Sequence, residues 1–284
     1  MHLVSTKDEL RQHLDAVRMA GRSVGFVPTM GALHEGHLSL VRAATADRDV
    51  VVLSIFVNPL QFAAAEDLET YPRPVERDLE LAESAGVDVV FSPSSREMYP
   101  APAFTSVHVG ALTSTMEGAA RPTHFDGVCT VVTKLFNLVG PCHAYFGEKD
   151  YQQLAVVTRM AADLDQPVTV VGCPIVREPD GLALSSRNVN LSAEQREAAG
   201  VLHRALRAGS TMISVGEHDG EAVAAHMAEV IAAEPSARLD YATVVDAATL
   251  EPLRALERDA EIRLLVAAAF GSTRLLDNVG VTVP

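Results

Sequence analysis

Short apolar runs alternate with amphipathic stretches along residues 1–175 of the chain. One run, Val50–Val57, is apolar at almost every position, which is typical of a strand buried on both faces of a parallel sheet. The apolar runs predict strands at Val24–Pro28, Val50–Val57, Val87–Phe91, Cys142–Phe146 and Val168–Gly172. The amphipathic stretches predict helices at Glu35–Ala46, Pro74–Ala85, Gly127–Val139 and Tyr151–Leu164. This alternation favours an α/β fold with a doubly wound parallel sheet and crossover helices.

The rest of the chain shows a different order of elements. Ser192 is followed three residues later by Gln195, which is the spacing of a helix-capping box. The pattern predicts helices at Ala193–Met212 and Glu221–Ala233, then strands at Leu239–Val245, Ile262–Ala268 and Thr273–Asn278. Two helices followed by three strands predict a smaller C-terminal α+β domain. We therefore expect one domain at residues 1–175 and a second at residues 176–284.

Composition and charge narrow the class of protein. The 284 residues are enough to bury a core without disulfides or a structural metal, in one large domain or two modest ones. The formal net charge of −14 disfavours a protein that binds nucleic acid or a membrane surface, because polyanions are repelled. A small anionic substrate is still compatible with this charge, since a site can be locally basic.

Cysteine usage and apolar run length bear on location. The three cysteines, Cys129, Cys142 and Cys173, are far apart in sequence, and we interpret each as a buried free thiol in a reducing cytoplasm. The N-terminal residues become charged before an apolar run develops, unlike a signal peptide. No run reaches the ~18 apolar residues that span a bilayer. We expect a cytoplasmic protein without membrane partners.

The segment Pro28–His37 follows the first predicted strand and opens a helix, where a doubly wound sheet binds phosphates. Gly31 and Gly36 allow the backbone to approach a ligand, and free N–H groups at the helix start favour an anion. His34 and His37 share a helix face and can donate to phosphate oxygens in a pentacovalent transition state. Their spacing of three differs from the H-E-x-x-H of zinc helices. The alternative is a pair of surface histidines.

Two further polar segments are candidate binding loops. Phe56–Phe62 ends the next strand, and the amide of Gln61 can both donate and accept toward a neutral polar substrate. The alternative is a plain strand-ending loop. Arg121–Gly127 precedes a helix, and a binding role there competes with a capping loop in which Asp126 is the cap.

Two more segments carry cations suited to phosphates. In Phe146–Gln153, Lys149 can reach a phosphate as a point charge, although Asp150 and Gln153 also have the spacing of a capping box. In Asp180–Asn188, two serine hydroxyls followed by Arg187 suit triphosphate oxygens, and the alternative is a serine-rich hinge.

These five motifs, in this order, resemble those of the pantothenate synthetase (pantoate–β-alanine ligase) family of the nucleotidylyltransferase superfamily. The H-x-x-H of His34 and His37 resembles the HIGH signature, and Leu184–Arg187 resembles the KMSKS loop. The resemblance implies a Rossmann-like domain that condenses (R)-pantoate with β-alanine at the expense of ATP, in the pathway to coenzyme A. Pantoyl adenylate would be the intermediate, with AMP and pyrophosphate released.

The resemblance also implies roles for individual residues. His37 would be the catalytic proton donor, with His34, Lys149 and Arg187 as further catalytic residues. ATP would contact Met30, Gly31, Ala32, Leu33, His34, Glu35, Gly36, His37, Gly147, Glu148, Lys149, Asp150, Val176, Leu184, Ser185, Ser186 and Arg187. Gln61 would bind both pantoate and β-alanine, and Gln153 pantoate. The family implies a homodimer and Mg²⁺ with ATP, for which the sequence assigns no protein ligands. Because Ser185, Ser186 and Arg187 lie at the expected boundary between the domains, we also expect the C-terminal domain to act as a lid.

Two other functions remain open from the residues. An adenylyltransferase that acts on a phosphate acceptor would use the same H-x-x-H element, although Gln61 and Gln153 suit such an acceptor less well than Arg or Lys. A non-catalytic nucleotide-binding module would not need both histidines together with Ser185, Ser186 and Arg187.

Overall fold

The computed structural model describes residues 1–62, 68, 71–101 and 104–284. The chain divides into two compact units. The first comprises Met1–Glu148 and Gln152–Pro174, and the second comprises Lys149–Tyr151 and Ile175–Pro284. A three-residue segment from the middle of the chain thus groups with the C-terminal residues.

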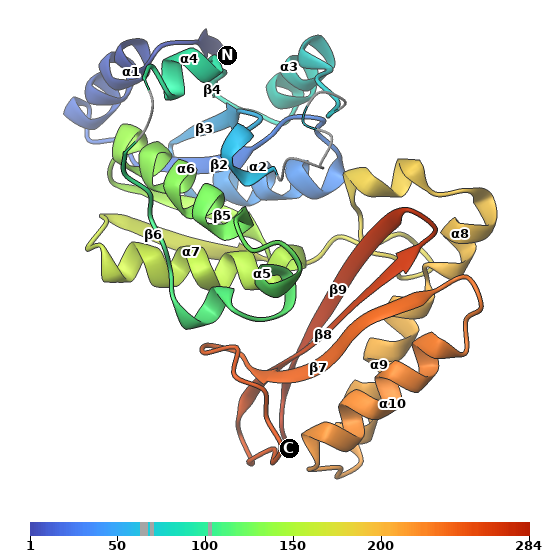
Figure 1. Ribbon diagram of the computed structural model, residues 1–284. Coiled ribbons are helices and arrows are strands. Elements are labelled where there is room, and N and C mark those ends of the chain that lie inside the picture. The colour runs from blue at the N-terminus through green and yellow to red at the C-terminus, as the bar shows by residue number, and fades with distance from the viewer. Residues whose placement is uncertain (63–67, 69–70, 102–103) are drawn as a thin grey trace. The chain divides into compact units, whose positions relative to one another are not determined.

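The first unit contains a six-stranded parallel sheet with the strand order β1-β4-β3-β2-β5-β6 (Figure 1). The strands are β1 (His2–Val4), β2 (Val24–Thr29), β3 (Val50–Ile55), β4 (Val89–Phe91), β5 (Cys142–Gly147) and β6 (Val168–Cys173). From β2 the chain proceeds outward through β3 and β4, and β5 then returns to the other side of β2. The predicted doubly wound parallel sheet is confirmed, and its switch point lies between β2 and β5.

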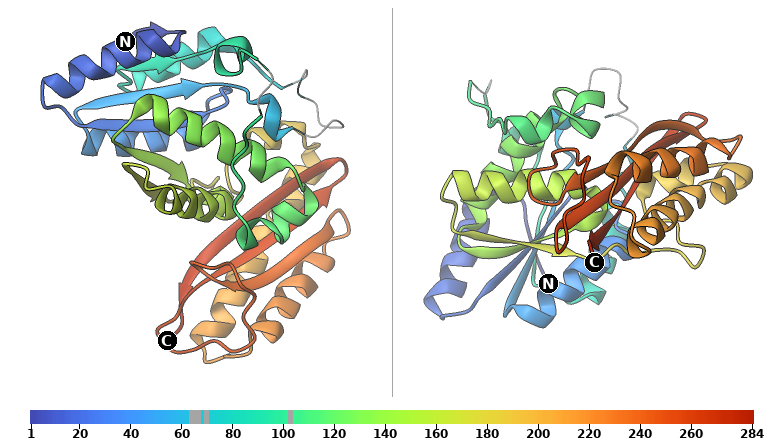
Figure 2. Two further views of the ribbon diagram at one scale, coloured as in Figure 1. Left: turned by 60° about the vertical axis from the view of Figure 1, so that its left-hand side comes forward. Right: turned by 90° about the horizontal axis from the view of Figure 1, so that it is seen from below.

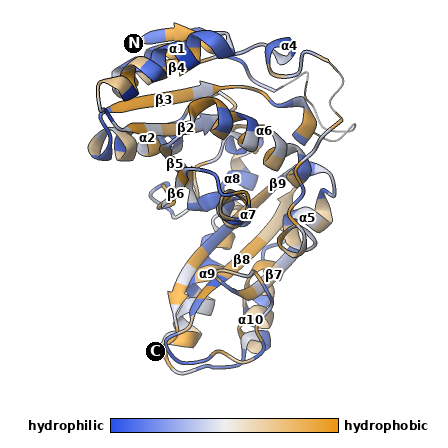
Figure 3. Cartoon of the chain, turned by 90° about the vertical axis from the view of Figure 1, so that its left-hand side faces the viewer, coloured by the Kyte–Doolittle hydropathy of each residue, from blue (hydrophilic) through white to orange (hydrophobic). Residues whose placement is uncertain are grey.

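Helices cover both faces of this sheet. They are α1 (Lys7–Met19), α2 (Glu35–Asp47), α3 (Val75–Ser84), α4 (Ser95–Met98), α5 (Met116–Ala120), α6 (His124–Val139) and α7 (Tyr151–Asp163). Side chains such as Phe26 and Val52 join a core with α1, α6 and α7. The alternate residues Val27 and Val51 pack with α2 and α3 instead. Figure 2 turns the ribbon to show these layers, and Figure 3 colours much of β3 as hydrophobic, consistent with a strand buried on both faces.

The second unit is an α+β structure with a separate sheet. Three antiparallel strands lie in the order β7-β8-β9, with bounds Arg238–Asp246, Glu261–Phe270 and Thr273–Thr282. The helices are α8 (Ala193–Ala198), α9 (Val201–Ser214) and α10 (Gly220–Ala232). Residues such as Leu206, Met227 and Leu264 form a core between α9, α10 and the central strand β8. The predicted smaller α+β region is confirmed.

Several boundaries differ from the prediction. The single helix expected at Ala193–Met212 is broken into α8 and α9, because the amides of Gly200 and Leu202 turn to i−3 carbonyls at 3.4 and 3.2 Å. The capping box of Ser192 and Gln195 is confirmed. The strand expected to reach Val57 ends at Ile55, where the chain turns toward Asn58.

All three cysteines are buried free thiols, as predicted. Burial raises the pKa of Cys129 and of Cys142 to about 12, so both thiols stay protonated at neutral pH. Among the described residues, none of the helices combines the length and the apolar character needed to cross a membrane.

Candidate active site

The H-x-x-H element lies where β2 ends and α2 begins, beside the switch point of the sheet. His34 is the N-cap of α2, and its Nδ1 accepts the N–H of Gly36 at 3.1 Å. The N–H of His34 in turn donates to Nδ1 of His37 at 3.4 Å. The two imidazole rings are 4.1 Å apart between centroids, with an interplanar angle of 39°. A reciprocal capping arrangement thus fixes both rings on the first turn of the helix.

These contacts determine the tautomers of the two histidines. A ring nitrogen that accepts a backbone N–H carries no proton, so a neutral imidazole of this kind has its proton on Nε2. Both His34 and His37 accept through Nδ1. Each neutral ring therefore carries its proton on Nε2, while the role of the two rings toward phosphate oxygens stays a prediction.

The backbone amides of the loop before the helix have partners inside the protein. The N–H of Gly31 donates to Oγ1 of Thr29 at 3.2 Å. The N–H groups of Ala32 and Leu33 donate to the carboxylate of Asp78 on α3, at 2.8 and 2.7 Å. These three amides precede the N-cap His34, so the free N–H groups expected at the helix start itself stay a prediction. The loop offers imidazole donors, while its amides hold the loop itself in shape.

The second motif meets the first through Gln61. Its side-chain Nε2 donates to Sδ of Met30 at 3.0 Å, and its Oε1 accepts from Nδ2 of Asn58 at 3.1 Å. Asn58 is 1% exposed, and its Oδ1 accepts the hydroxyl of Tyr99 at 2.9 Å. Burial raises the pKa of Tyr99 to about 12, which keeps the phenol protonated as a donor. A buried chain of hydrogen bonds thereby orients the Gln61 amide.

The third motif holds the backbone of Gln61. Nδ1 of His124 and Nη2 of Arg121 lie 3.0 and 3.3 Å from the carbonyl oxygen of Gln61, so both act as donors to it. At Gly127 a Cβ would lie 2.3 Å from the carbonyl oxygen of Leu60, so only glycine allows this close approach. The motifs around His34, Gln61 and Arg121 are therefore brought together in the first unit.

One interpretation of the third motif is wrong. Asp126 does not cap a helix, because α6 already begins at His124 and Thr123 occupies the N-cap position. Asp126 instead pairs with Nδ1 of His108 at 2.8 Å. The helix begins at His124 rather than at the predicted Gly127, and Phe125 in its first turn is buried with Val128 and Cys129 in the core.

The fourth motif is divided between the two units. Gly147 ends β5, next to β2 at the switch point, and Glu148 follows it. Gln153 is half-buried on α7, beside Gln152. Gln152 is 3% exposed and accepts the N–H of Glu117, so it anchors a loop rather than a ligand.

Lys149 belongs to the second unit because it and its neighbour Tyr151 contact residues of that unit. Its carbonyl accepts from Nδ2 of Asn278 on β9 at 2.9 Å, and its Nζ lies 3.4 Å from a carboxylate oxygen of Asp150. The guanidinium of Arg263 lies 3.7 Å above the centre of the Tyr151 ring. The Lys149 backbone is thus fixed, with a side chain 19% exposed.

The fifth motif lies on a hairpin in the same unit. Val176 and Leu184 are joined by a backbone hydrogen bond of 2.9 Å, and Arg177 bridges Ala183. Ser185 then accepts the N–H of Arg187 at 3.2 Å and caps the short 3₁₀ segment Ser186–Asn190. The Arg187 side chain is exposed and makes no hydrogen bond or ion pair within the described part of the chain.

Sequence reasoning missed the residues that connect these two motifs. Arg177 donates to both carboxylate oxygens of Asp277 and to the carbonyl of Asn278. Asn278 also donates to the Lys149 carbonyl. Residues 277 and 278 of β9 therefore connect the Lys149 segment to the hairpin that carries Arg187.

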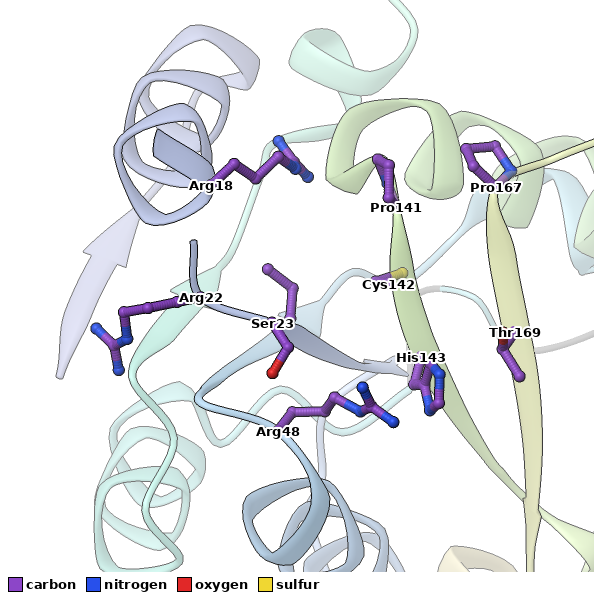
Figure 4. Close-up of a pocket in the computed structure, with 10 residues that line it drawn as sticks. Arg18, Arg22, Ser23, Arg48, Pro141, Cys142, His143, Pro167 and Thr169 are labelled. Carbon is purple, nitrogen blue, oxygen red and sulfur yellow. The ribbon is translucent and has the colours of Figure 1, made fainter. Parts of the chain in front are cut away.

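Two cavities flank the sheet of the first unit. One, of about 360 Å³, lies at the amino ends of the strands and is lined by Arg18, Arg48 and His143 (Figure 4). Its cations are engaged: Arg18 donates to the Val139 carbonyl and Arg48 pairs with Asp47. The other, of about 300 Å³, lies at the carboxyl ends and is lined by residues that include Met30, Gly31 and Asp78. The second cavity adjoins the motifs, as expected for this fold.

Comparisons with known proteins agree with this arrangement. A family model described as pantoate-beta-alanine ligase matches residues 2–280. Proteins named pantothenate synthetase are 52% identical over 283 residues in Moorella thermoacetica and 54% identical over 278 residues in Agrobacterium fabrum. The alignments cover 100% of this chain and 99% of the first protein, and 98% of this chain and 95% of the second.

Solved structures give the same result. Pantothenate synthetase from Thermus thermophilus superposes with a TM-score of 0.92 at 51% identity, over 98% of this chain and 99% of that one. The Francisella tularensis pantoate-beta-alanine ligase, complexed with β,γ-ATP and β-alanine, has a TM-score of 0.80 at 33% identity, over 98% and 97% of the two chains. The chain belongs to the pantoate–β-alanine ligase family.

Proposed function

We propose that this ligase activates pantoate as pantoyl adenylate before β-alanine attacks. A pantoate carboxylate oxygen attacks the α-phosphorus of ATP, and the bond to the bridging oxygen breaks to release pyrophosphate. The amine of β-alanine then attacks the acyl carbon, loses a proton and expels AMP. Support comes from the family match and from the relative solved with β,γ-ATP and β-alanine.

The observation that carries the proposal is the paired Nδ1 acceptance of His34 and His37. It sets two Nε2–H donors side by side on the first turn of α2, at the switch point of the sheet. Donors fixed before the reaction stabilise developing phosphate charge without reorganising. The positive end of α2 adds to their effect. His37 acts here as a hydrogen-bond donor through Nε2–H, because a neutral imidazole whose Nδ1 accepts a backbone N–H keeps its own proton.

Amides bind the acceptor substrates in this proposal. The Gln61 amide binds pantoate and β-alanine, and its orientation is fixed by Asn58 and Met30. Gln153 on α7 binds pantoate. Amides donate and accept at once, which suits the hydroxyl and carboxylate groups of pantoate better than a phosphate.

ATP contacts the residues from Met30 to His37, from Gly147 to Asp150, and Val176 with Leu184 to Arg187. Lys149 and Arg187 neutralise the β- and γ-phosphates that depart as pyrophosphate. No group of three or more His, Cys, Asp or Glu side chains among the described residues is arranged to hold a metal. Mg²⁺ commonly needs one or two carboxylates besides phosphates and water. We propose that Mg²⁺ accompanies ATP, where it would neutralise phosphate charge.

The test is the fate of labelled oxygen. The purified enzyme is incubated with ATP, β-alanine and pantoate that carries ¹⁸O in its carboxylate. The proposal expects AMP and pyrophosphate, with ¹⁸O in AMP. ADP and inorganic phosphate, with the label in phosphate, would exclude the adenylate. Pantoate-dependent ATP–pyrophosphate exchange without β-alanine is the matching test of the first step.

We further propose a cytoplasmic homodimer, for which sedimentation of the purified protein tests the oligomeric state.

A further inference from the structure

Asp78 holds the loop before α2 with both of its carboxylate oxygens. It lies in the first turn of α3 and is 1% exposed. Oδ2 accepts the N–H of Ala32 at 2.8 Å, and Oδ1 accepts the N–H of Leu33 at 2.7 Å. No Lys, Arg or His within the described residues forms an ion pair with it. Two amides and the positive end of α3 therefore stabilise its charge.

The loop that Asp78 holds is strained. Gly31 has a φ of +85° and Ala32 a φ of +51°, so an alanine occupies the left-handed region. An L-residue with a Cβ is strained in this region, so the conformation persists only where the surroundings impose it. At Gly31 a Cβ would lie 2.9 Å from Oδ2 of Asp78, so this glycine also gives the carboxylate room.

The imidazoles follow directly from this turn. Leu33, whose N–H is held by Asp78, precedes His34 in the chain. The backbone N–H of His34 is the donor to Nδ1 of His37, and His34 itself caps the helix. A shift of the Ala32–Leu33 backbone therefore moves the N-cap and the contact that sets the His37 ring.

We infer that Asp78 is a positioning residue for the ligation: its buried carboxylate imposes the left-handed turn at Gly31–Ala32 and thereby places the His34 and His37 rings. The inference rests on the proposed role of these histidines in adenylation. Asp78 acts through the loop amides and the two rings, without contact to the reacting atoms.

The first test replaces Asp78 by asparagine. Asp78→Asn keeps one acceptor and turns an NH₂ group against a backbone N–H. Misplacement of catalytic groups by about 1 Å costs on the order of 100-fold in rate. We expect pantoate-dependent exchange to fall by about that factor in kcat, with the KM for ATP changed less than about threefold, because donors that act in the transition state are displaced. The imidazole ¹⁵N resonance of His37 Nδ1 is expected to lose its hydrogen-bonded shift.

The second test is rescue. Asp78→Asn combined with Ala32→Gly should recover part of the lost exchange, since glycine adopts the left-handed turn without strain. Gly31→Ala leaves Asp78 in place but presses a methyl group against its Oδ2. Because Gly31 itself is proposed to contact ATP, the readout for this variant is the ¹⁵N resonance of His37 Nδ1, which should shift as it does in Asp78→Asn. This variant tests the inference even where Asp78→Asn does not fold. Asp88→Asn is the matched control: Asp88 accepts the N–H of Val51 at 2.8 Å in the same unit, and exchange is expected within twofold of the wild type.

The outcomes separate the inference from the proposed function. A wild-type enzyme without pantoate-dependent exchange overturns the adenylate proposal. An active wild type with an equally active Asp78→Asn variant overturns the positioning role. A loss that Ala32→Gly does not relieve, with unchanged His37 resonances, also overturns it. If excess Mg²⁺ restored the exchange activity of Asp78→Asn, the positioning role would be overturned and Asp78 would be identified as a metal ligand.

Discussion

Arg177 and Asp277 are a hundred residues apart in the chain and form a two-pronged ion pair, with N···O distances of 2.6 and 2.9 Å. The Asp277 side chain is 1% exposed, whereas that of Arg177 is 21% exposed. Arg177 also donates to the carbonyl of Gly181. The pair therefore fastens the hairpin from Val176 to Leu184 onto β9.

Removal of Arg177 is expected to destabilise the second unit. Arg177→Met leaves the Asp277 carboxylate buried without its cation, and loss of one partner of a buried pair costs about 3–5 kcal/mol. Urea denaturation followed by circular dichroism measures the loss. Arg177→Met with Asp277→Leu should recover much of it, because no charge is then left unpaired. A double variant as unstable as the single one would contradict this account.

His37→Ala is expected to lower pantoyl adenylate formation by about 10²–10³-fold, the usual cost of removing one preorganised donor. Its contact with the His34 N–H is long, at 3.4 Å, so the free energy of unfolding should change little. Pantoate-dependent ATP–pyrophosphate exchange measures the loss of adenylation, and urea denaturation measures the free energy of unfolding. Near-normal adenylate formation by this variant would remove His37 from the mechanism.

Lys149→Ala and Arg187→Ala are expected to impair mainly the first step. The Lys149 carbonyl keeps its bond to Asn278 when the side chain is shortened, and Arg187 is exposed, so neither change should unfold the chain. Both cations act on phosphate that leaves as pyrophosphate. Each variant is assayed with ATP plus pantoate, and separately with supplied pantoyl adenylate plus β-alanine. Equal losses of activity in the two assays would contradict the claim that Lys149 and Arg187 act mainly in the first step.

The parallel strands that carry the site could be predicted from the sequence because they are buried on both faces. Strand β1 was missed since three residues at a sheet edge form too short a run to show a pattern. Helix α1 was missed as well, although Thr6 and Glu9 form a capping box at its start. Breaks such as the one after α8 depend on local hydrogen bonding that periodicity does not report.

The motifs of the candidate site could be predicted because their residue types are unusual at strand ends. The residues that hold these motifs in place, such as Asp78 and Asp277, could not be predicted. Asp78 looks like one charge among several in a polar helix. A signal was present: Asp78 stands beside Leu79 and four positions before Ala82, so the carboxylate shares the apolar face of the helix. Asp277 likewise follows Thr273 and Leu275 on the buried side of β9. Which partner each carboxylate meets depends on tertiary structure.

The last prediction concerns pH and His203. Burial, and after it the charge of Arg177, lowers the pKa of this histidine below its ordinary 6.5. The unfolded chain therefore takes up a proton at a pH where the folded state stays neutral, and stability falls as pH drops below about 6.5. A Cβ at Gly181 would lie 2.1 Å from the His203 ring, so the hairpin turn packs tightly against it.

We expect the urea midpoint to fall between pH 7 and pH 5.5, and His203→Gln to flatten part of that slope. Burial also lowers the pKa of His13, which accounts for a remaining slope. An unchanged slope in His203→Gln would show that His203 titrates alike in the folded and unfolded states.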